Sequence, residues 1–136
     1  MYNCNLMKFK CINGQYGKLV PIEGNFDVPF QIKRVFYIYG VDSNVIRGHH
    51  ALRKSHQILI CLKGSVKIRL RTPIDEEIVE LSNPEEGLYI GKLIWREMFD
   101  FSEDAVLFVL ASEHFEEEDY IRNYDFYLNE AKDFFR

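Results

Sequence analysis

The sequence predicts a single all-β domain, a small sandwich or barrel, with one α-helix at its C-terminal end. Apolar and polar residues alternate with a period of two along most of the chain, and Gly, Pro, Asn and Asp separate the runs. Roughly nine such runs fit into one small domain, which favours a sandwich or barrel over a parallel sheet with crossover helices. After Ser112 the apolar period changes to three and four residues, which is typical of an amphipathic helix.

The expected strands are short runs rich in Val, Ile, Leu, Phe and Tyr that end at turn residues. The segment Leu62-Lys63-Gly64-Ser65-Val66 joins two alternating runs through a glycine, which predicts a β-hairpin. No strand is predicted for the segment 47–56, which leads into the run that starts at Gln57. In chain order, the predicted strands cover residues 7–11, 18–22, 34–40, 57–63, 65–71, 76–81, 87–90, 94–100 and 105–111.

The last part of the chain predicts one helix that reaches the C-terminus. The acidic stretch 113–119 comes first and would complement the positive N-terminal end of a helix dipole. We expect the aromatic face of this helix to pack on the sheet or on a second subunit. The residues that set its spacing are Tyr120, Ile121, Tyr124, Tyr127, Leu128, Ala131 and Phe135.

Length and composition indicate one folded domain over residues 1–136. Hydrophobic residues make up 47% of the chain and charged residues 28%, which excludes a disordered chain. The net charge is −4, which argues against a broad nucleic-acid surface. The longest apolar runs, 58–62 and 105–111, are too short to cross a membrane, and the N-terminus does not resemble a secretory signal. We therefore expect a cytoplasmic protein, in which Cys4, Cys11 and Cys61 stay reduced.

Three of the four histidines lie in the segment 47–57. An imidazole at the mouth of a barrel titrates near neutral pH, as a general base requires. From His50 onward, Gln57 and Gly64 occur at the intervals of the first cupin motif, which this segment resembles. Leu52, Gln57 and Arg96 occupy the places of the other metal ligands in that motif, and none of them suits a transition metal. We expect His49 and His56 to lie on a surface loop, and we predict no metal site.

Two further groups are candidates for a site. Arg96 and Glu97 lie beside Trp95 in an apolar segment, so they either line a cavity or form a buried ion pair. Arg34 and Arg47 supply guanidinium groups near aromatic strand residues, a combination that suits a nucleotide diphosphate.

Together these segments closely resemble the cupin-fold dTDP-4-keto-6-deoxyglucose 3,4-ketoisomerases, over essentially the whole chain. The resemblance implies a small cupin, or jelly-roll, barrel with a C-terminal helix. The segments that carry it are Gly17-Lys18-Leu19, Pro21-Ile22-Glu23, Pro29-Phe30, Ile32-Lys33-Arg34-Val35, Arg47-Gly48, Gln57, Gly64-Ser65, Gly87-Leu88-Tyr89-Ile90, Trp95, Glu97-Met98, Asp100-Phe101, Val109-Leu110-Ala111-Ser112, Asp119-Tyr120-Ile121-Arg122 and Tyr124-Asp125.

The resemblance implies an enzyme that works without a metal or other cofactor and moves a ketone from C4 to C3 of a dTDP-sugar through an enediol, in the synthesis of bacterial surface glycans. It also implies a homodimer, commonly with exchange of N-terminal strands. His50 is implied as the catalytic base, with Tyr37 and Arg96 as further catalytic residues. The substrate-binding residues implied are Arg34, Arg47, Tyr16, Gln57, Ser65, Trp95 and Glu97.

The branch and the activity depend on three positions. Galacto-type members have Arg before Gly17 and His at position 96, whereas this chain has Tyr16 and Arg96 as gluco-type members do. The expected product is therefore dTDP-3-keto-6-deoxyglucose, with an equatorial C4 hydroxyl, on the route to 3-amino-3,6-dideoxyglucose. The family normally carries His-x-His, and Leu52 replaces the second histidine. We expect His50 alone to suffice for proton abstraction, with a water or Tyr16 as a substitute for the second histidine.

Two alternatives stay open at this point. One is a dTDP-sugar 3,5-epimerase, which also abstracts a proton next to a ketone. The other is a cupin that binds a dTDP-sugar without catalysis, because the second histidine is lost.

Overall fold

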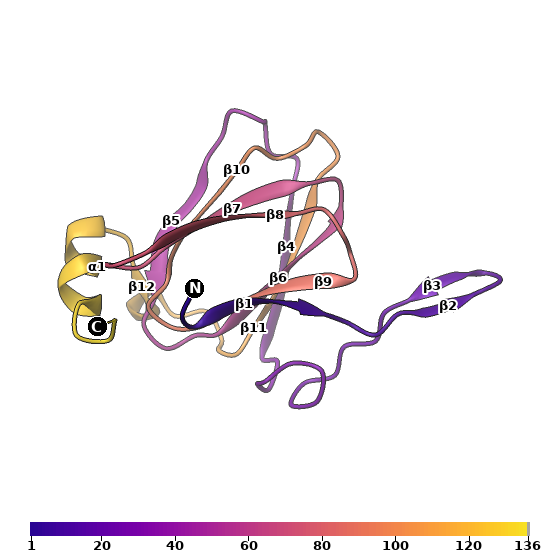
Figure 1. The fold of residues 1–136 in the computed structure, drawn as a ribbon, viewed down its shortest axis with the longest axis horizontal. Helices are drawn as coiled ribbons and strands as arrows, with labels where there is room; N and C mark the ends of the chain where they lie inside the picture. The colour runs from indigo at the N-terminus through magenta and orange to yellow at the C-terminus, as the bar shows by residue number, and fades with distance from the viewer. Residues whose placement is uncertain (136) are drawn as a thin grey trace.

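Two antiparallel five-stranded sheets face each other, with a hairpin at one end and a helix at the other (Figure 1). The computed structural model describes residues 1–135. The first sheet has the order β1-β9-β6-β11-β4, and the second has the order β12-β5-β10-β7-β8. Their bounds are β1 Cys4–Lys8, β4 Arg34–Tyr39, β5 Arg47–Leu52, β6 Gln57–Lys63, β7 Val66–Arg71, β8 Glu76–Leu81, β9 Glu86–Ile90, β10 Trp95–Phe99, β11 Val106–Ala111 and β12 Tyr120–Ile121.

The predicted all-β class with a C-terminal helix is confirmed. The helix α1 covers Tyr124–Ala131 and follows a single 3-10 turn, Glu117–Asp119. The hairpin of β2 (Ile12–Gly14) and β3 (Gly17–Leu19) extends away from the sandwich (Figure 1). In the described residues no helix is long and apolar enough to cross a membrane.

Strand β6 has a continuous apolar sequence because both of its faces are covered. Leu59 and Cys61 belong to the hydrophobic core between the two sheets. Ile58 and Ile60 point the other way and pack against Val28 and Phe30, in the segment that covers the outer face of the first sheet. Alternation along the strand therefore contributes to two apolar layers rather than to one apolar and one solvated face.

Gly64 connects the two sheets, so the predicted β6–β7 hairpin is wrong. Strand β6 pairs with β9 and β11, whereas β7 pairs with β8 and β10. Gly64 has φ 72°, and a Cβ there would lie 2.2 Å from the Ser102 hydroxyl. A glycine between two alternating runs marks a sharp turn, but sequence alone does not show whether the next strand pairs or changes sheet.

The C-terminal helix is shorter than predicted. Tyr120 and Ile121 form β12, which pairs with β5, and the helix begins only at Tyr124. The Asn123 side chain caps the helix by accepting a hydrogen bond from the Phe126 amide at 3.0 Å. Phe135 lies beyond the helix and is buried in the core, so the three- and four-residue spacing continues past the helix at both ends.

Strand β5 was not predicted, and it contains a bulge. Arg96 and Glu97 of β10 pair with His50 and Gly48, which leaves His49 without a partner in the ladder. Gly48 and His49 both have positive φ, at 93° and 53°. Residues three apart normally point to opposite faces of a strand, but the extra residue puts Arg47 and His50 on the same face.

The bulge requires glycine at position 48. A Cβ there would lie 2.9 Å from the Arg96 carbonyl oxygen, which belongs to backbone and cannot move freely. Gly48→Ala should therefore lower the free energy of unfolding by about 2–4 kcal/mol, from the positive φ and the clash together.

The matched control is Gly40→Ala, measured by urea unfolding under the same conditions. Gly40 also has a positive φ, at 69°, but nothing lies within 4 Å of a Cβ built there. Gly40→Ala should lower the free energy of unfolding by about 1–2 kcal/mol, because only the backbone conformation is strained. Equal losses in the two variants would show that the close approach to Arg96 contributes nothing.

Candidate active site

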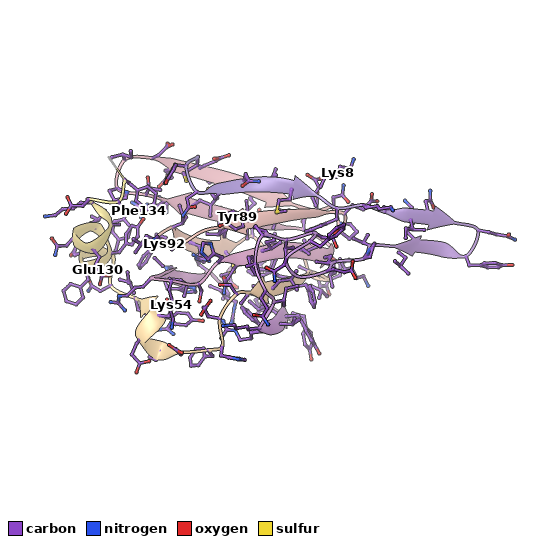
Figure 2. All side chains as sticks on the ribbon, turned by 90° about the horizontal axis from the view of Figure 1, so that it is seen from below. Lys8, Lys54, Tyr89, Lys92, Glu130 and Phe134 are labelled. Carbon is purple, nitrogen blue, oxygen red and sulfur yellow. The ribbon has the colours of Figure 1, made fainter. Side chains whose placement is uncertain are left out.

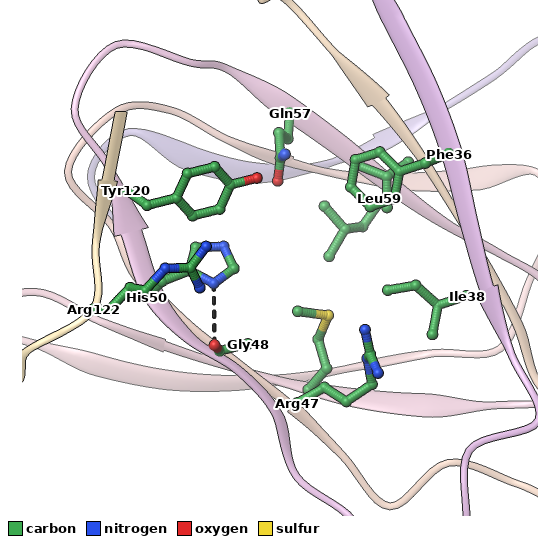
Figure 3. Close-up of a pocket in the computed structure, with 11 residues that line it drawn as sticks. Phe36, Ile38, Arg47, Gly48, His50, Gln57, Leu59, Tyr120 and Arg122 are labelled. Carbon is green, nitrogen blue, oxygen red and sulfur yellow. Dashed lines mark hydrogen bonds between the residues drawn. The ribbon is translucent and has the colours of Figure 1, made fainter. Parts of the chain in front are cut away.

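A cavity of about 200 Å³ opens between the two sheets beside the bulge of β5 (Figure 3). Its walls come from both sheets and from the segment after β12. One side is apolar, and the other carries ionisable and amide side chains. The apolar residues are Phe36, Ile38, Leu59, Met98 and Val109, and the polar ones are Arg47, His50, Gln57, Tyr120 and Arg122.

His50 is set up as a neutral base. Its Nδ1 lies 3.1 Å from the Gly48 carbonyl oxygen, which can only accept, so Nδ1 carries the proton and Nε2 has a free lone pair (Figure 3). Burial lowers the pKa of His50 to about 3, and the positive charge of Arg96 adds to this effect. The imidazole is therefore deprotonated at neutral pH, which is the state that a general base needs.

Arg96 is a buried cation behind the cavity, with only 1% of its surface exposed. It donates from Nη1 to Gln57 Oε1 at 2.9 Å and from Nη2 to the Ile94 carbonyl oxygen at 3.0 Å. Burial lowers its pKa to about 10, so it stays charged at neutral pH. Its Nε has no hydrogen-bond partner, and no salt bridge to Arg96 occurs within residues 1–135.

Trp95 and Glu97 lie on the other face of β10, which corrects the expectation that they line the same pocket. Neighbouring strand residues point to opposite faces, so neither shares a face with Arg96, and Arg96 and Glu97 do not form an ion pair. Arg96 itself contacts Gln57 but is not among the residues that line the cavity. Glu97 accepts a hydrogen bond from the Trp95 indole at 3.0 Å and lies 3.8 Å from His49 Nδ1. His49 thus points away from His50, and it belongs to a strand rather than to a loop.

Three other predicted residues lie outside the cavity. Tyr37 is on the outer face of β4, 63% exposed, with its ring stacked 6.1 Å from that of Tyr39. Ser65 is in the turn after β6, where its amide donates to the Ser102 hydroxyl. Tyr16 is 96% exposed in the turn of the β2–β3 hairpin, which projects away from the sandwich in both whole-chain views (Figures 1 and 2).

Arg34 and Arg47 are positioned to bind an anion at the cavity. Arg47 lines the cavity from β5. Arg34 donates from Nη2 to Tyr120 Oη at 3.3 Å and packs over the Phe36 ring at 4.8 Å. Its buried Nε has no partner, which leaves a donor available at this site.

Tyr120 and Arg122 are site residues that the sequence analysis did not identify. The Tyr120 ring lies 4.9 Å from the His50 ring. Arg122 follows two residues later, and its guanidinium lies 4.5 Å from the Tyr120 ring. Arg122 is also paired with Glu117 at 2.7 Å. Because the period of three and four residues predicted a helix from Tyr120, the pairing of this segment with β5 was missed. The only signal for it was the tyrosine and arginine at alternate positions, 120 and 122.

The donors around His50 do not suit a metal ion. Leu52 is buried and offers no lone pair, and the Gln57 carbonyl oxygen already accepts a hydrogen bond from Arg96. In the described part of the chain no three His, Cys, Asp or Glu side chains are placed to bind a metal. The guanidinium of Arg96 would also repel a cation. A neutral base surrounded by arginines instead suits proton abstraction from an anionic ligand.

Comparisons with known proteins agree with this chemistry. A family model described as "FdtA: WxcM-like, C-terminal" matches residues 2–132. The TDP-4-oxo-6-deoxy-alpha-D-glucose-3,4-oxoisomerase of Aneurinibacillus thermoaerophilus is 45% identical over 120 residues, which are 88% of this chain and 86% of that protein.

Solved structures are similar over nearly the whole chain. QdtA, a sugar 3,4-ketoisomerase from Thermoanaerobacterium thermosaccharolyticum solved with TDP, is 61% identical with a TM-score of 0.98, over 100% of this chain and 99% of that one. Two mutants of QdtA are also similar: a His-to-Asn mutant with TDP-4-keto-6-deoxyglucose, and a double mutant, Tyr to Arg and Arg to His, with TDP. WlaRB, a TDP-quinovose 3,4-ketoisomerase from Campylobacter jejuni, is 44% identical with a TM-score of 0.92, over 95% and 99% of the two chains.

The low pKa of His50 predicts a specific loss of stability in acid. Between pH 6.5 and about 3, the unfolded chain protonates this imidazole while the folded protein keeps it neutral. The unfolded state then binds more protons, so the free energy of unfolding falls as the pH decreases through this window. From pH 7 to pH 5 the contribution of His50 should be about 2 kcal/mol.

Urea unfolding of the protein and of His50→Asn at both pH values measures this contribution. On acidification from pH 7 to pH 5, the free energy of unfolding of His50→Asn should fall by about 2 kcal/mol less than that of the parent. His114→Asn, on the exposed segment after β11, keeps His50 and should lose as much as the parent. An equal loss in His50→Asn and the parent would contradict the low pKa.

Proposed function

The chain belongs to the FdtA (WxcM-like, C-terminal) family, and from that premise we propose that it is a sugar-nucleotide 3,4-ketoisomerase. Its substrate is dTDP-4-keto-6-deoxyglucose and its product is dTDP-3-keto-6-deoxyglucose, so the reaction is an intramolecular oxidation and reduction. One observation supports the proposal most strongly. The bulge of β5 directs a neutral His50, with its Nε2 unprotonated, into a cavity that is surrounded by guanidinium groups.

His50 begins the reaction by taking the proton from C3, which is acidic because it lies next to the C4 ketone. The C3–H electron pair becomes the C3–C4 double bond, and the carbonyl pair moves to O4. Loss of the O3 proton and addition of a proton at C4 then complete the isomerisation. The C3 proton and the O3 proton leave, and one proton arrives at each of O4 and C4, so the atoms balance.

The substrate itself strengthens the base. In the free protein the pKa of His50 is low because of burial and of nearby arginines. A diphosphate bound by Arg47 and Arg34 brings negative charge into the same site, which favours the imidazolium and raises the pKa of His50. Proton abstraction is therefore favoured only when the nucleotide is present, which links catalysis to recognition of the diphosphate.

The expected stereochemistry requires a second proton source. In the gluco series the C3 and C4 hydrogens are both axial on adjacent carbons, so they project from opposite faces of the ring. A single imidazole faces one side and cannot serve both positions. Tyr16 and Arg96 support the gluco assignment, because the Tyr and Arg changed in the QdtA double mutant have numbers one higher than these two. The His changed in the other mutant has a number one higher than His50.

A homodimer would bring the outlying residues to the site. Tyr16 and Tyr37 are exposed, although the family resemblance implies that both are site residues. We propose that the β2–β3 hairpin of each subunit crosses to its partner, so that Tyr16 closes the cavity next to the partner's His50.

We also propose that the protein works in the cytoplasm, where its product is available to an aminotransferase that installs nitrogen at C3.

Conversion in D2O, followed by proton NMR, tests the reaction. The ketone of dTDP-4-keto-6-deoxyglucose should move to C3, and the product should carry one deuterium at C4 because the C4 proton comes from the side away from His50. His50→Asn should lower kcat by about 10²–10⁴-fold while TDP still binds. Exchange at C5 would indicate an epimerase, binding without change would indicate a non-catalytic protein, and full turnover by His50→Asn would rule out this base.

Heterodimers test the shared site. Subunits with Tyr16→Ala and subunits with His50→Asn, each slow alone, are co-expressed with different tags and purified as the mixed dimer. One of the two sites then has an intact His50 and an intact Tyr16 from the partner, so the activity should return to about half of the wild-type value. Sedimentation as a monomer, or a mixed dimer no faster than its parents, contradicts the crossing hairpin.

A further inference from the structure

We propose that Tyr120 is a catalytic residue whose hydroxyl donates to the ketone oxygen as negative charge develops there. The inference rests on the proposed ketoisomerase function and goes beyond it, because it assigns the electrophile that complements His50. The sequence placed Tyr120 in a segment that carries the family resemblance, but it assigned this residue no role in the site.

The position of Tyr120 is fixed from two sides. Its backbone pairs with Leu52 of β5, two residues beyond His50 on the same strand. Its ring lies 4.9 Å from the imidazole of His50 and 5.4 Å from the ring of Phe115. The two rings lie side by side at one end of the cavity (Figure 3). We expect the base and the hydroxyl to reach neighbouring atoms of one sugar ring, as C3–H and O4 require.

The hydrogen bonds of Tyr120 leave its proton available. Arg34 Nη2 donates to Tyr120 Oη at 3.3 Å, so the oxygen acts as an acceptor toward Arg34. Within residues 1–135 no acceptor for the Tyr120 hydroxyl proton is found, and no salt bridge neutralises Arg34. A cation beside the phenol oxygen stabilises negative charge on it, which makes the O–H a stronger donor.

The other groups in the cavity are less suited to this role. Nε2 of His50 has no proton before the reaction, because Nδ1–H is bonded to Gly48. Arg122 is paired with Glu117. The Gln57 carbonyl oxygen is an acceptor and is occupied by Arg96. Tyr120 lies directly beside the base, and no hydrogen bond within residues 1–135 uses its hydroxyl proton.

The step balances without a further reagent. The C3–H bond breaks toward His50 Nε2, the C3–C4 double bond forms, and the carbonyl pair moves to O4, which takes the proton of Tyr120 Oη. The tyrosinate, stabilised by Arg34, then takes the O3 proton as the C3 ketone forms. C4 receives a proton from solvent on the opposite face, His50 releases its proton to solvent, and the enzyme returns to its first state.

Tyr120→Phe tests the assignment, because it removes only the hydroxyl. With dTDP-4-keto-6-deoxyglucose, kcat should fall about 10²–10³-fold, the range for loss of one oxyanion donor. Exchange of the C3 proton with D2O should slow by the same factor, whereas TDP affinity and the thermal unfolding temperature should change little. Tyr2→Phe, which removes an exposed hydroxyl remote from the cavity, is the matched control and should keep wild-type kcat.

Arg34→Gln and the double variant provide an independent test. If Arg34 acts on the reaction through Tyr120, the loss of kcat in the double variant is smaller than the product of the two single losses. A Tyr120→Phe kcat within threefold of an active wild type would overturn the role of Tyr120, and a fully multiplicative double variant would overturn its coupling to Arg34. A wild type that does not turn over the substrate would instead refute the ketoisomerase function.

Discussion

The buried guanidinium of Arg96 is the constraint on which the site depends. Burying an unpaired charge costs several kcal/mol, and hydrogen bonds reduce this cost. Here Gln57 Oε1 and the Ile94 carbonyl oxygen each accept one hydrogen bond from the guanidinium, whereas Nε has no partner. The charge then acts on everything near it. It adds to the effect of burial in lowering the pKa of His50, it discourages a metal ion, and it adds to the positive field that attracts a diphosphate.

The geometry of the site depends on a backbone irregularity next to that charge. A Cβ atom at position 48 would lie only 2.9 Å from the Arg96 carbonyl oxygen, so only glycine fits there. The extra residue in the bulge turns Arg47 and His50 to the same side and gives His50 Nδ1 a carbonyl acceptor. One bulge thus determines which residues face the cavity and which nitrogen of His50 acts as the base.

The chain does not bring all the predicted site residues together in one cavity. His50, Arg47 and Gln57 line the cavity, and Arg34 reaches it through Tyr120. Tyr16 and Tyr37 are exposed aromatic side chains outside the cavity. Trp95 and Glu97 stabilise the outer face of β10 instead, where Trp95 packs against Tyr124 of the helix α1.

The all-β class, the C-terminal helix and the chemistry of the key residues follow from the amino-acid sequence alone. A period of two can be read locally, and His50, Gln57 and Arg96 carry their chemical character in any fold. Three features are visible only in the folded chain: the chain passes from one sheet to the other at Gly64, Tyr120 joins a strand beside His50, and Glu97 faces away from the cavity. These features depend on pairing between segments distant in sequence and on one inserted residue, and a one-residue shift reverses the face of every side chain after it.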